Sequence, residues 1–435
     1  MAIDAACPQM GIILDTDNKM TLPDSASVFS HSLIDWLVNK GLEGAGQEEL
    51  LEGFCARLVE MGIPLMRFHA AQSTLHPVYG GTGYSWYNGA GGESEKFEYT
   101  ETPSEVWQQS PLYALLNDDL DEIRVKLVDH NEPSRFPLLN DLREIGATDY
   151  YATGLSYEGA SQLRPDGTKK VSDGVLMSWT SDAPNGFEDS DLNKIQTVLP
   201  HLGLALKSAK NQDLAKDLMR VYLGRDAGRR VLSGEIRRGS LQQIDAVIWN
   251  FDLEGFTTLS EDLPGHEIID MLNDYLAVAV GVVHDKGGNI LKFMGDGLMA
   301  MFDVGEIDED ARAALDAVPL LQSRMGELNA RRRAQGLPVA NYTLALHSGE
   351  ILYGNIGSET RLDFTVIGPA VNQAARIAGM HRSLGQRILI SDDVARAAQP
   401  CAQELVSVGR YMLRGVNEPK ELFTVYSPGG PSESD

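Results

Sequence analysis

The sequence is poor in cysteine, in long apolar runs and in basic residues. Its 435 residues include three cysteines, far apart and in no metal-binding spacing: Cys7, Cys55 and Cys401. We therefore expect reduced thiols, and neither a disulfide framework nor a zinc site. No apolar run reaches the about 18 to 20 residues that cross a membrane, and the N-terminus lacks the basic segment and apolar core of a signal peptide. These absences predict a cytoplasmic protein without a membrane span.

Acidic residues outnumber basic ones by 62 to 37, which gives a formal net charge of −25 at pH 7. Such a surface repels nucleic-acid phosphate and anionic lipid, so we expect no nucleic-acid partner. An anionic substrate would need local cations or metal ions to overcome this field. Any pair of carboxylates that could hold a metal ion therefore becomes a candidate site.

The length fits two α+β domains with a connector. Apolar periodicity predicts helices at residues 28–38 and 48–60, and strands at residues 63–71, 149–157 and 174–180. We expect a flexible tail at residues 1–26. Residues 88–145 are acidic and punctuated by prolines, which predicts a long irregular segment.

Two helices, antiparallel strands, a long loop and an exit helix resemble a GAF domain, a small-molecule sensor module, over residues 27–206. A PAS-like sensor is the alternative. Five aromatic residues either pack in its core or line a ligand pocket: Tyr84, Trp86, Tyr87, Tyr150 and Tyr151. Cys55 lies in a predicted helix, which argues against a covalently bound bilin. The expected partner is therefore a small-molecule effector whose identity the sequence does not give.

A helical connector follows the sensor. From Asp191 onward the apolar positions keep a three-four spacing with one shift, and we expect Pro200 to bend the helix or loosen one turn. The first part of this helix is either the sensor's last helix, packed on its own domain, or the start of a parallel two-helix connector between protomers. We favour the connector for residues 207–223. With the basic, glycine-rich junction after it, the connector region spans residues 207–240.

Two aspartates follow short apolar runs in the C-terminal half. Asp252 ends the strand expected at residues 246–251, and Asp296 lies between two glycines in a predicted hairpin tip. Carboxylates beside glycine, which lets a ligand approach the backbone closely, suit a divalent ion. One amphipathic helix separates the two, which suggests neighbouring strands that meet at one metal site. The turn of Phe256 and Thr257 directs free N–H groups outward, as in a phosphate cradle.

The helix and strands expected after Asp296 complete the order of elements of a known fold. A helix is expected at residues 308–333, and strands at residues 342–347 and 350–355 with a turn at Ser348 and Gly349 between them. The order strand, helix, hairpin, helix, strand is that of a ferredoxin-like palm. The fold class predicted for the whole chain is α+β: a GAF-like sensor domain, a helical connector and this palm.

Five motifs stand in one order along this half: FDLEGFTTLSE at 251–261, GGNILKFMGDG at 287–297, HSGEILYGNIG at 347–357, FTVIGPAVNQAARI at 364–377 and LRGVNEPKELFTV at 413–425. At these residues the chain resembles the catalytic domain of class III nucleotidyl cyclases, over residues 241–427. A short tail at residues 428–435 follows. The resemblance implies an enzyme that makes a cyclic nucleotide and pyrophosphate.

The resemblance also implies a metal site. Asp252 and Asp296 match the metal-binding aspartates of the family, and the Leu253 carbonyl is a further expected ligand. Together they imply two Mg²⁺ or Mn²⁺ ions per active site. Such ions lower the pKa of the ribose 3′-hydroxyl that attacks the α-phosphorus, and they neutralise the triphosphate and the departing pyrophosphate.

Other residues match the family's substrate contacts. Asn372 and Arg376 lie four residues apart and so share one helix face; they match the pair that orients the ribose and stabilises charge on the α-phosphate in the transition state. Lys292 and Thr365 match the base-selecting positions, where a cationic donor and a hydroxyl imply adenine and hence ATP. Arg414 matches a basic position that contacts the triphosphate. Threonine in place of the more usual aspartate resembles the subgroup in which bicarbonate-responsive cyclases occur.

In this family the metal-binding aspartates come from one subunit and the other matched residues from its partner. All of them are present in this chain, so the resemblance implies a homodimer with two shared active sites. The predicted function is an adenylate cyclase regulated by an N-terminal sensor domain. A guanylate cyclase and a catalytically silent signalling dimer are the alternatives.

Overall fold

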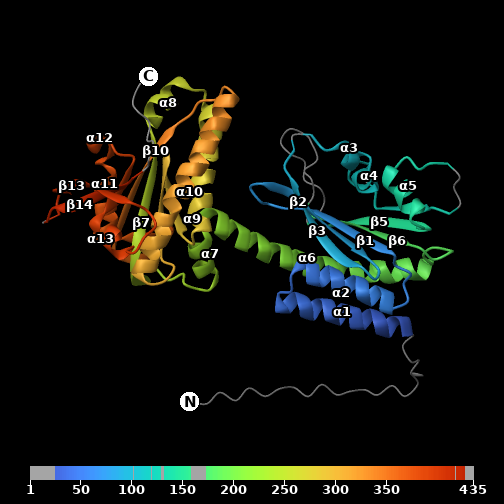
Figure 1. Cartoon of the computed structure of the whole chain (residues 1–435). Helices are drawn as coiled ribbons and strands as arrows, with labels where there is room; N and C mark the ends of the chain where they lie inside the picture. Colours follow the sequence, from blue (N-terminus) through green and yellow to red (C-terminus); the bar gives the residue numbers. More distant parts are fainter. Residues whose placement is uncertain are drawn as a thin grey trace, which may run out of the picture. The chain divides into compact units, whose positions relative to one another are not determined.

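The computed structural model describes residues 25–100, 102–118, 120–128, 132–157, 173–416 and 418–426 (Figure 1). The chain divides into two compact units, Met1–Leu214 and Ala215–Asp435, and each combines helices with a β-sheet, as predicted for an α+β protein. Apart from the start of α1 (Ser25–Glu43), the predicted tails lie outside the described residues. None of the described helices has the length and apolar character needed to cross a membrane.

The N-terminal unit is built on one antiparallel sheet of six strands, in the order β3-β2-β1-β6-β5-β4. Its strands are β1 (Arg67–Ser73), β2 (Tyr79–Tyr87), β3 (Gly91–Glu98), β4 (Glu122–Lys126), β5 (Asp149–Ser156) and β6 (Gly174–Ser181). Its helices, besides α1, are α2 (Gln47–Glu60), α3 (Glu105–Gln108), α4 (Pro111–Asn117), α5 (Pro137–Glu144) and α6 (Asp189–Leu223). Figure 1 shows α1, α2 and α6 on one face of this sheet and α3, α4 and α5 on the other.

The expectation of a long irregular segment at residues 88–145 is wrong, because it contains β3, α3, α4, β4 and α5. Prolines and serines start helices here instead of breaking them. The Ser104 and Ser110 hydroxyls cap α3 and α4 by accepting backbone N–H groups, and α4 and α5 both begin at a proline. Proline fits the first helical position because its missing N–H would have no partner there.

The aromatic residues singled out in the sequence are mostly core residues. Tyr84, Trp86, Tyr150 and Tyr151 are buried, whereas Tyr87 is 40% exposed. The Tyr84 hydroxyl and the Trp86 indole N–H donate to the two carboxylate oxygens of one glutamate on α2, at 2.8 and 3.2 Å. The rings of the four buried residues therefore pack in the cores of this unit, and the Tyr150 hydroxyl has no hydrogen-bond partner among the described residues.

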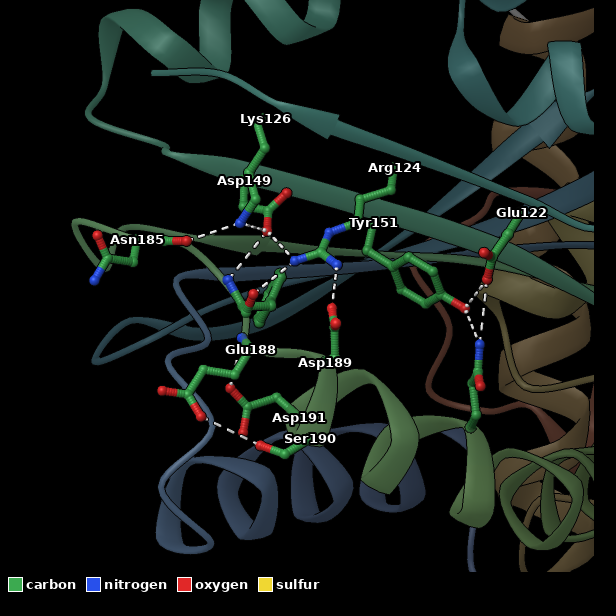
Figure 2. Close-up of polar contacts among 12 residues, drawn as sticks. Glu122, Arg124, Lys126, Asp149, Tyr151, Asn185, Glu188, Asp189, Ser190 and Asp191 are labelled. Carbon is green, nitrogen blue, oxygen red and sulfur yellow. Dashed lines mark hydrogen bonds and ion pairs between the residues drawn. The ribbon is translucent and has the colours of Figure 1, made fainter. Parts of the chain in front are cut away.

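The start of α6 is attached to the sheet by a charged cluster (Figure 2). Fully buried Asp149 on β5 accepts from Lys126 Nζ at 2.8 Å, from Arg124 Nη2 at 3.1 Å and from the Phe187 N–H at 3.0 Å. The other arm of Arg124 pairs with Asp189, the first residue of α6, at 2.9 Å. One guanidinium thus bridges a sheet carboxylate and a helix carboxylate. The helix then continues for 35 residues through Pro200 without interruption.

The C-terminal unit contains an eight-stranded sheet in the order β13-β14-β12-β10-β7-β9-β8, with β11 paired to β10. The strands are β7 (Leu241–Glu254), β8 (Asn289–Met294), β9 (Gly297–Phe302), β10 (Asn341–Gly357), β11 (Leu362–Ile367), β12 (Ile388–Ser391), β13 (Leu405–Tyr411) and β14 (Lys420–Val425). The helices are α7 (Arg225–Leu232), α8 (Phe256–Asp262), α9 (Gly265–Asp285), α10 (Ile307–Ala334), α11 (Pro369–Ala378), α12 (His381–Leu384) and α13 (Asp392–Ala397).

The central strands β10-β7-β9-β8, with α9 and α10 between them in the chain, have the βαββαβ order expected of the palm. One core packs α9 and α10 against the sheet, and a second core on the other face includes α11 and a residue of α7. α10 carries acidic residues in its first turn and arginines in its last, which complements the helix dipole.

In the C-terminal unit, strands β7 and β10 differ from the sequence prediction. β7 does not end at Asp252 but continues to Glu254, and β10 is one strand of 17 residues with no turn at Ser348 and Gly349. β10 pairs with β7 without a break from Asn341 to Gly354. The backbone at Gly349 has φ 159°, which is extended, so the Ser-Gly pair continues the ladder instead of reversing the chain.

Candidate active site

The two candidate metal-binding aspartates lie next to each other. β7 pairs with β9 up to Phe251 and Leu298, so Asp252 is opposite the turn that contains Asp296. A methyl group built on Gly297 would be 2.5 Å from an Asp252 carboxylate oxygen. Only glycine lets the turn approach Asp252 so closely, and the sequence analysis did not assign it this role.

The electrostatics of the pair favour a bound cation. Burial, followed by the negative charge of Asp296, raises the pKa of Asp252 to about 6. Among the described residues, no lysine, arginine or histidine forms an ion pair with either carboxylate, and no cluster of three or more His, Cys, Asp or Glu side chains surrounds them. The two carboxylates repel each other, and a divalent ion would relieve this repulsion. Its remaining ligands would be backbone, water or substrate oxygens.

The neighbouring candidates contribute through their backbones more than their side chains. The Leu253 side chain is 3% exposed and belongs to the core, so only its carbonyl remains for a ligand. Gly255 has φ 74° and precedes α8, which begins at Phe256. The Phe256 ring packs on the core and Thr257 is exposed.

The candidate base-selecting residues lie on strands that approach each other. Lys292 on β8 is exposed. Thr365 on β11 is buried, and its hydroxyl has no hydrogen-bond partner in the part of the chain that the structure describes. Residues flanking both belong to one core: Leu291 packs against the cluster that contains Phe364 and Val366. The unpartnered Thr365 hydroxyl is able to bind a ligand.

Asn372 and Arg376 both lie on α11, one turn apart, as predicted. Asn372 is exposed and Arg376 is half-buried. The Arg376 guanidinium lies against Gly415, where an added methyl group would be 3.4 Å from Nη2. The structure therefore brings Arg376 to the loop that carries Arg414, an arrangement that the spacing along the chain did not reveal.

The structure separates Asp252 from Thr365. Asp252 pairs with Thr343 of β10, whereas Thr365 pairs with Gly354, 11 residues further along the same strand. A straight strand would place these points roughly 35 Å apart. Asp252 and Thr365 thus lie toward opposite ends of β10.

Comparison with known proteins identifies the family of the C-terminal unit. Residues 240–427 match the family model described as adenylate and guanylate cyclase catalytic domain. An adenylate cyclase of Anabaena cylindrica is 40% identical over 149 residues, which cover 33% of this chain and 29% of that protein. Adenylate cyclase 1 of Rhizobium meliloti is 29% identical over 227 residues, which cover 50% of this chain and 34% of that protein. The chain spans about a third of the length of these two relatives.

Solved structures include similar chains. A crystal structure of the adenylyl cyclase CyaB from P. aeruginosa is 29% identical, with 43% of this chain and 97% of that chain covered and a TM-score of 0.40. The guanylyl cyclase Cya2 is 31% identical, with 44% and 95% covered and a TM-score of 0.39. From the family match and the curated relatives, the chain contains a class III adenylate and guanylate cyclase catalytic domain.

Proposed function

We propose that this protein is an adenylate cyclase that converts ATP to 3′,5′-cyclic AMP and pyrophosphate. The observation that carries the proposal is the close approach of Asp252 and Asp296, two carboxylates that no cation compensates within the described residues. Similarity to two curated adenylate cyclases supports adenine as the base.

The acidic pair would hold two Mg²⁺ or Mn²⁺ ions, with the Leu253 carbonyl as a further ligand. When bound, such ions lower the pKa of the ribose 3′-hydroxyl and neutralise the triphosphate. The fit rests on the position of Asp252 beside the turn that carries Asp296. Burial, followed by the negative charge of Asp296, raises the pKa of Asp252, and a bound cation would oppose both effects. No protein base is then required, and the hydroxyl proton passes to water or to the triphosphate.

The chain's own residues bind the substrate and stabilise the transferring group. The 3′-oxygen forms a bond to the α-phosphorus. The bond between the α-phosphorus and the oxygen that bridges the α- and β-phosphates breaks, and pyrophosphate leaves. Arg376 would donate N–H groups to the α-phosphate oxygens as charge develops there, and Asn372 would hold the ribose. Arg414 and the backbone N–H groups of Phe256 and Thr257 would bind the triphosphate.

Lys292 and Thr365 would select the base. A lysine ammonium donates to adenine N1, and a threonine hydroxyl accepts from the 6-amino group. The buried hydroxyl of Thr365 has no partner among the described residues, which leaves it free for this contact. The bicarbonate response found in some threonine-containing cyclases stays a prediction for this chain.

The active form is proposed to be a homodimer with two shared active sites. Asp252 and Thr365 lie toward opposite ends of β10, so one copy would need a second copy to complete the set around one nucleotide. Each site would take the aspartates from one protomer and the base-selecting and α11 residues from its partner. A monomer would then be inactive.

The N-terminal unit is proposed to regulate this reaction. We assign residues 27–206 to a GAF-like sensor domain for a small-molecule effector and residues 207–240 to the connector and junction, ahead of the cyclase domain at 241–427. The 35-residue helix α6, which starts in the sensor, supports a mechanical link. The cytoplasmic location remains a prediction from the sequence.

The test is an assay of the purified full chain with ATP or GTP and either Mg²⁺ or Mn²⁺, with cyclic nucleotides measured by mass spectrometry. We expect cyclic AMP and a preference for ATP. A preference for GTP would instead support the guanylate cyclase. No cyclic product under any condition would favour a silent signalling dimer.

A further inference from the structure

One face of the N-terminal sheet carries two polar cross-strand rows. The register of β2, β1, β6 and β5 places the following side chains next to one another in the first row: Tyr87, Arg67, Thr180 and Tyr150. The second row contains Ser85, His69, Ser178 and Ala152. Cross-strand partners project to the same face, so these residues share one surface of the sheet. It is the face opposite the core packed by α1, α2 and α6, in which Phe68 and Trp179 lie.

The polar groups of these rows are buried. Arg67 is 7% exposed, and Tyr150, Ser178 and Thr180 are at most 1% exposed. Four of their atoms are inaccessible to solvent and have no hydrogen-bond partner among the residues that the structure describes: Arg67 Nη1, Tyr150 Oη, Ser178 Oγ and Thr180 Oγ1. The Tyr150 and Ser178 hydroxyls lie close together, but no hydrogen bond of standard geometry joins them. Four unsatisfied polar atoms in one place are unusual, because most buried polar groups in proteins are paired.

Arg67 differs from Arg124 on the same sheet. Arg124 pairs with two carboxylates and accounts for much of the network in Figure 2. Arg67 donates from Nε to the Tyr87 hydroxyl at 3.1 Å, and none of the described carboxylates forms an ion pair with it. By register, Glu93 lies on the same face but two strands from His69, roughly 10 Å away. Among the described residues the buried guanidinium therefore has no counterion, and the Tyr87 ring lies 5.7 Å from its Cζ atom.

The neighbouring histidine, His69, adds no second positive charge. Burial and the charge of Arg67 lower the pKa of His69 to about 4, so this imidazole is neutral at neutral pH. Water could satisfy the hydroxyls, but it would leave the guanidinium charge uncompensated. An unpaired buried charge is costly, and proteins keep one where a ligand supplies the opposite charge.

We propose that this polar face is a binding site for a small organic acid whose carboxylate pairs with Arg67 and accepts hydrogen bonds from Tyr150, Ser178 and Thr180. A single guanidinium matches a monoanion, and its planar fork matches the two oxygens of a carboxylate. Apolar side chains near the rows, among them Ala71 and Leu176, would contact the remainder of the acid.

The site could report to the rest of the chain through β6. Ser178 and Thr180 belong to this strand, which is followed within ten residues by α6. A carboxylate bound to both hydroxyls would fix the end of β6 close to the point where Arg124 bridges the sheet and Asp189. This proposal does not depend on cyclase activity, because binding alone tests it.

The experiment uses the purified full chain without nucleotide. Unfolding is followed by calorimetry with sodium acetate, propionate, pyruvate or benzoate, against sodium chloride and inorganic phosphate at matched ionic strength. At a ligand concentration about 100 times Kd, linkage should raise the Tm of the N-terminal unit by about 5 to 10 °C. Arg67→Met should abolish the shift. Arg57→Met, on α2 and outside the polar face, should retain it and serves as the matched control.

Conservative variants keep the test decisive if Arg67→Met does not fold. Tyr150→Phe and Thr180→Val each remove one hydroxyl and should weaken binding about 10- to 150-fold, as expected for a hydrogen bond to a charged group. Isothermal titration with the carboxylate that gives the largest shift measures the change. An equal or larger shift with phosphate would overturn the choice of a carboxylate. No shift with any of the acids, or a shift that survives in all three variants, would overturn the site.

Discussion

The acidic pair of the catalytic unit and the polar rows of the N-terminal sheet differ in charge sign but share one property. Asp252 and Asp296 are carboxylates without a cation, and Arg67 is a guanidinium without an anion, within the described residues. Asp149, by contrast, is paired with Arg124 and Lys126, and buried Asp310 accepts two backbone N–H groups. Charged groups that lack such partners indicate where a ligand of opposite charge would bind.

The largest expected effect tests the acidic pair. Asp296→Ala should lower cyclase activity at least about 10³-fold, because the site then loses one of its two carboxylates. Arg376→Ala should do the same through lost transition-state stabilisation. Mixing the two inactive proteins should restore part of the activity, because a heterodimer contains one intact site. Asp316→Ala, an exposed aspartate of α10, is the control that should stay active. Absence of recovery on mixing would count against shared sites.

A smaller effect is expected from the base-selecting pair. Replacing Lys292 with Glu and Thr365 with Cys together should shift the ratio of kcat/KM for ATP and GTP about 10- to 100-fold toward GTP, since the donor and acceptor pattern is reversed. Steady-state assays with both nucleotides measure it. An unchanged ratio in an active double variant would remove both residues from base selection.

Replacing each of the two arginines of the N-terminal sheet should change the free energy of unfolding in a different direction. Arg124→Met removes a partner of buried Asp149 and one tie to α6, and should destabilise the unit by about 1–3 kcal/mol. Arg67→Met removes an uncompensated charge, and in ligand-free protein it should leave stability unchanged or raise it by up to about 2 kcal/mol. Urea unfolding of both variants measures the difference. Equal losses would mean that Arg67 is a structural residue like Arg124.

The smallest effect is a pH dependence present in both units. Burial lowers the pKa of His347 in the catalytic unit from 6.5 to about 4, as it does for His69 in the N-terminal unit. The unfolded chain therefore binds these protons more tightly, and each group's contribution to stability is lost as the pH falls from about 6.5 toward 4. Going from about pH 7.5 to about pH 5 should cost on the order of 1–2 kcal/mol per histidine. Calorimetry of His347→Asn and His69→Asn should show a weaker pH dependence in the respective unit; an unchanged slope would contradict this assignment.

The sequence predicts those features of the fold and site that depend on residues close together in the chain. The palm order, the hairpin that carries Asp296 and the shared helix of Asn372 and Arg376 all follow from apolar periodicity and glycine positions, and the structure has them. The single strand β10 could not be predicted, because a Ser-Gly pair reads as a turn unless its partner strand is known. For the same reason the polar rows cannot be predicted from the sequence. Ser178 and Thr180 alternate with buried Trp179 in the sequence, but only the register shows that Arg67 lies beside them.

The missing side chain of Gly297 has a consequence for how the dimer could be taken apart experimentally. An alanine there would push against the Phe251 carbonyl and the Asp252 carboxylate, although it removes no charged or polar group from the chain. Such a protein should still assemble with an unmodified copy and present an intact α11 face to it. This variant would separate assembly from catalysis: it would form the dimer and supply the α11 residues, but its own aspartates would no longer be placed to bind metal ions.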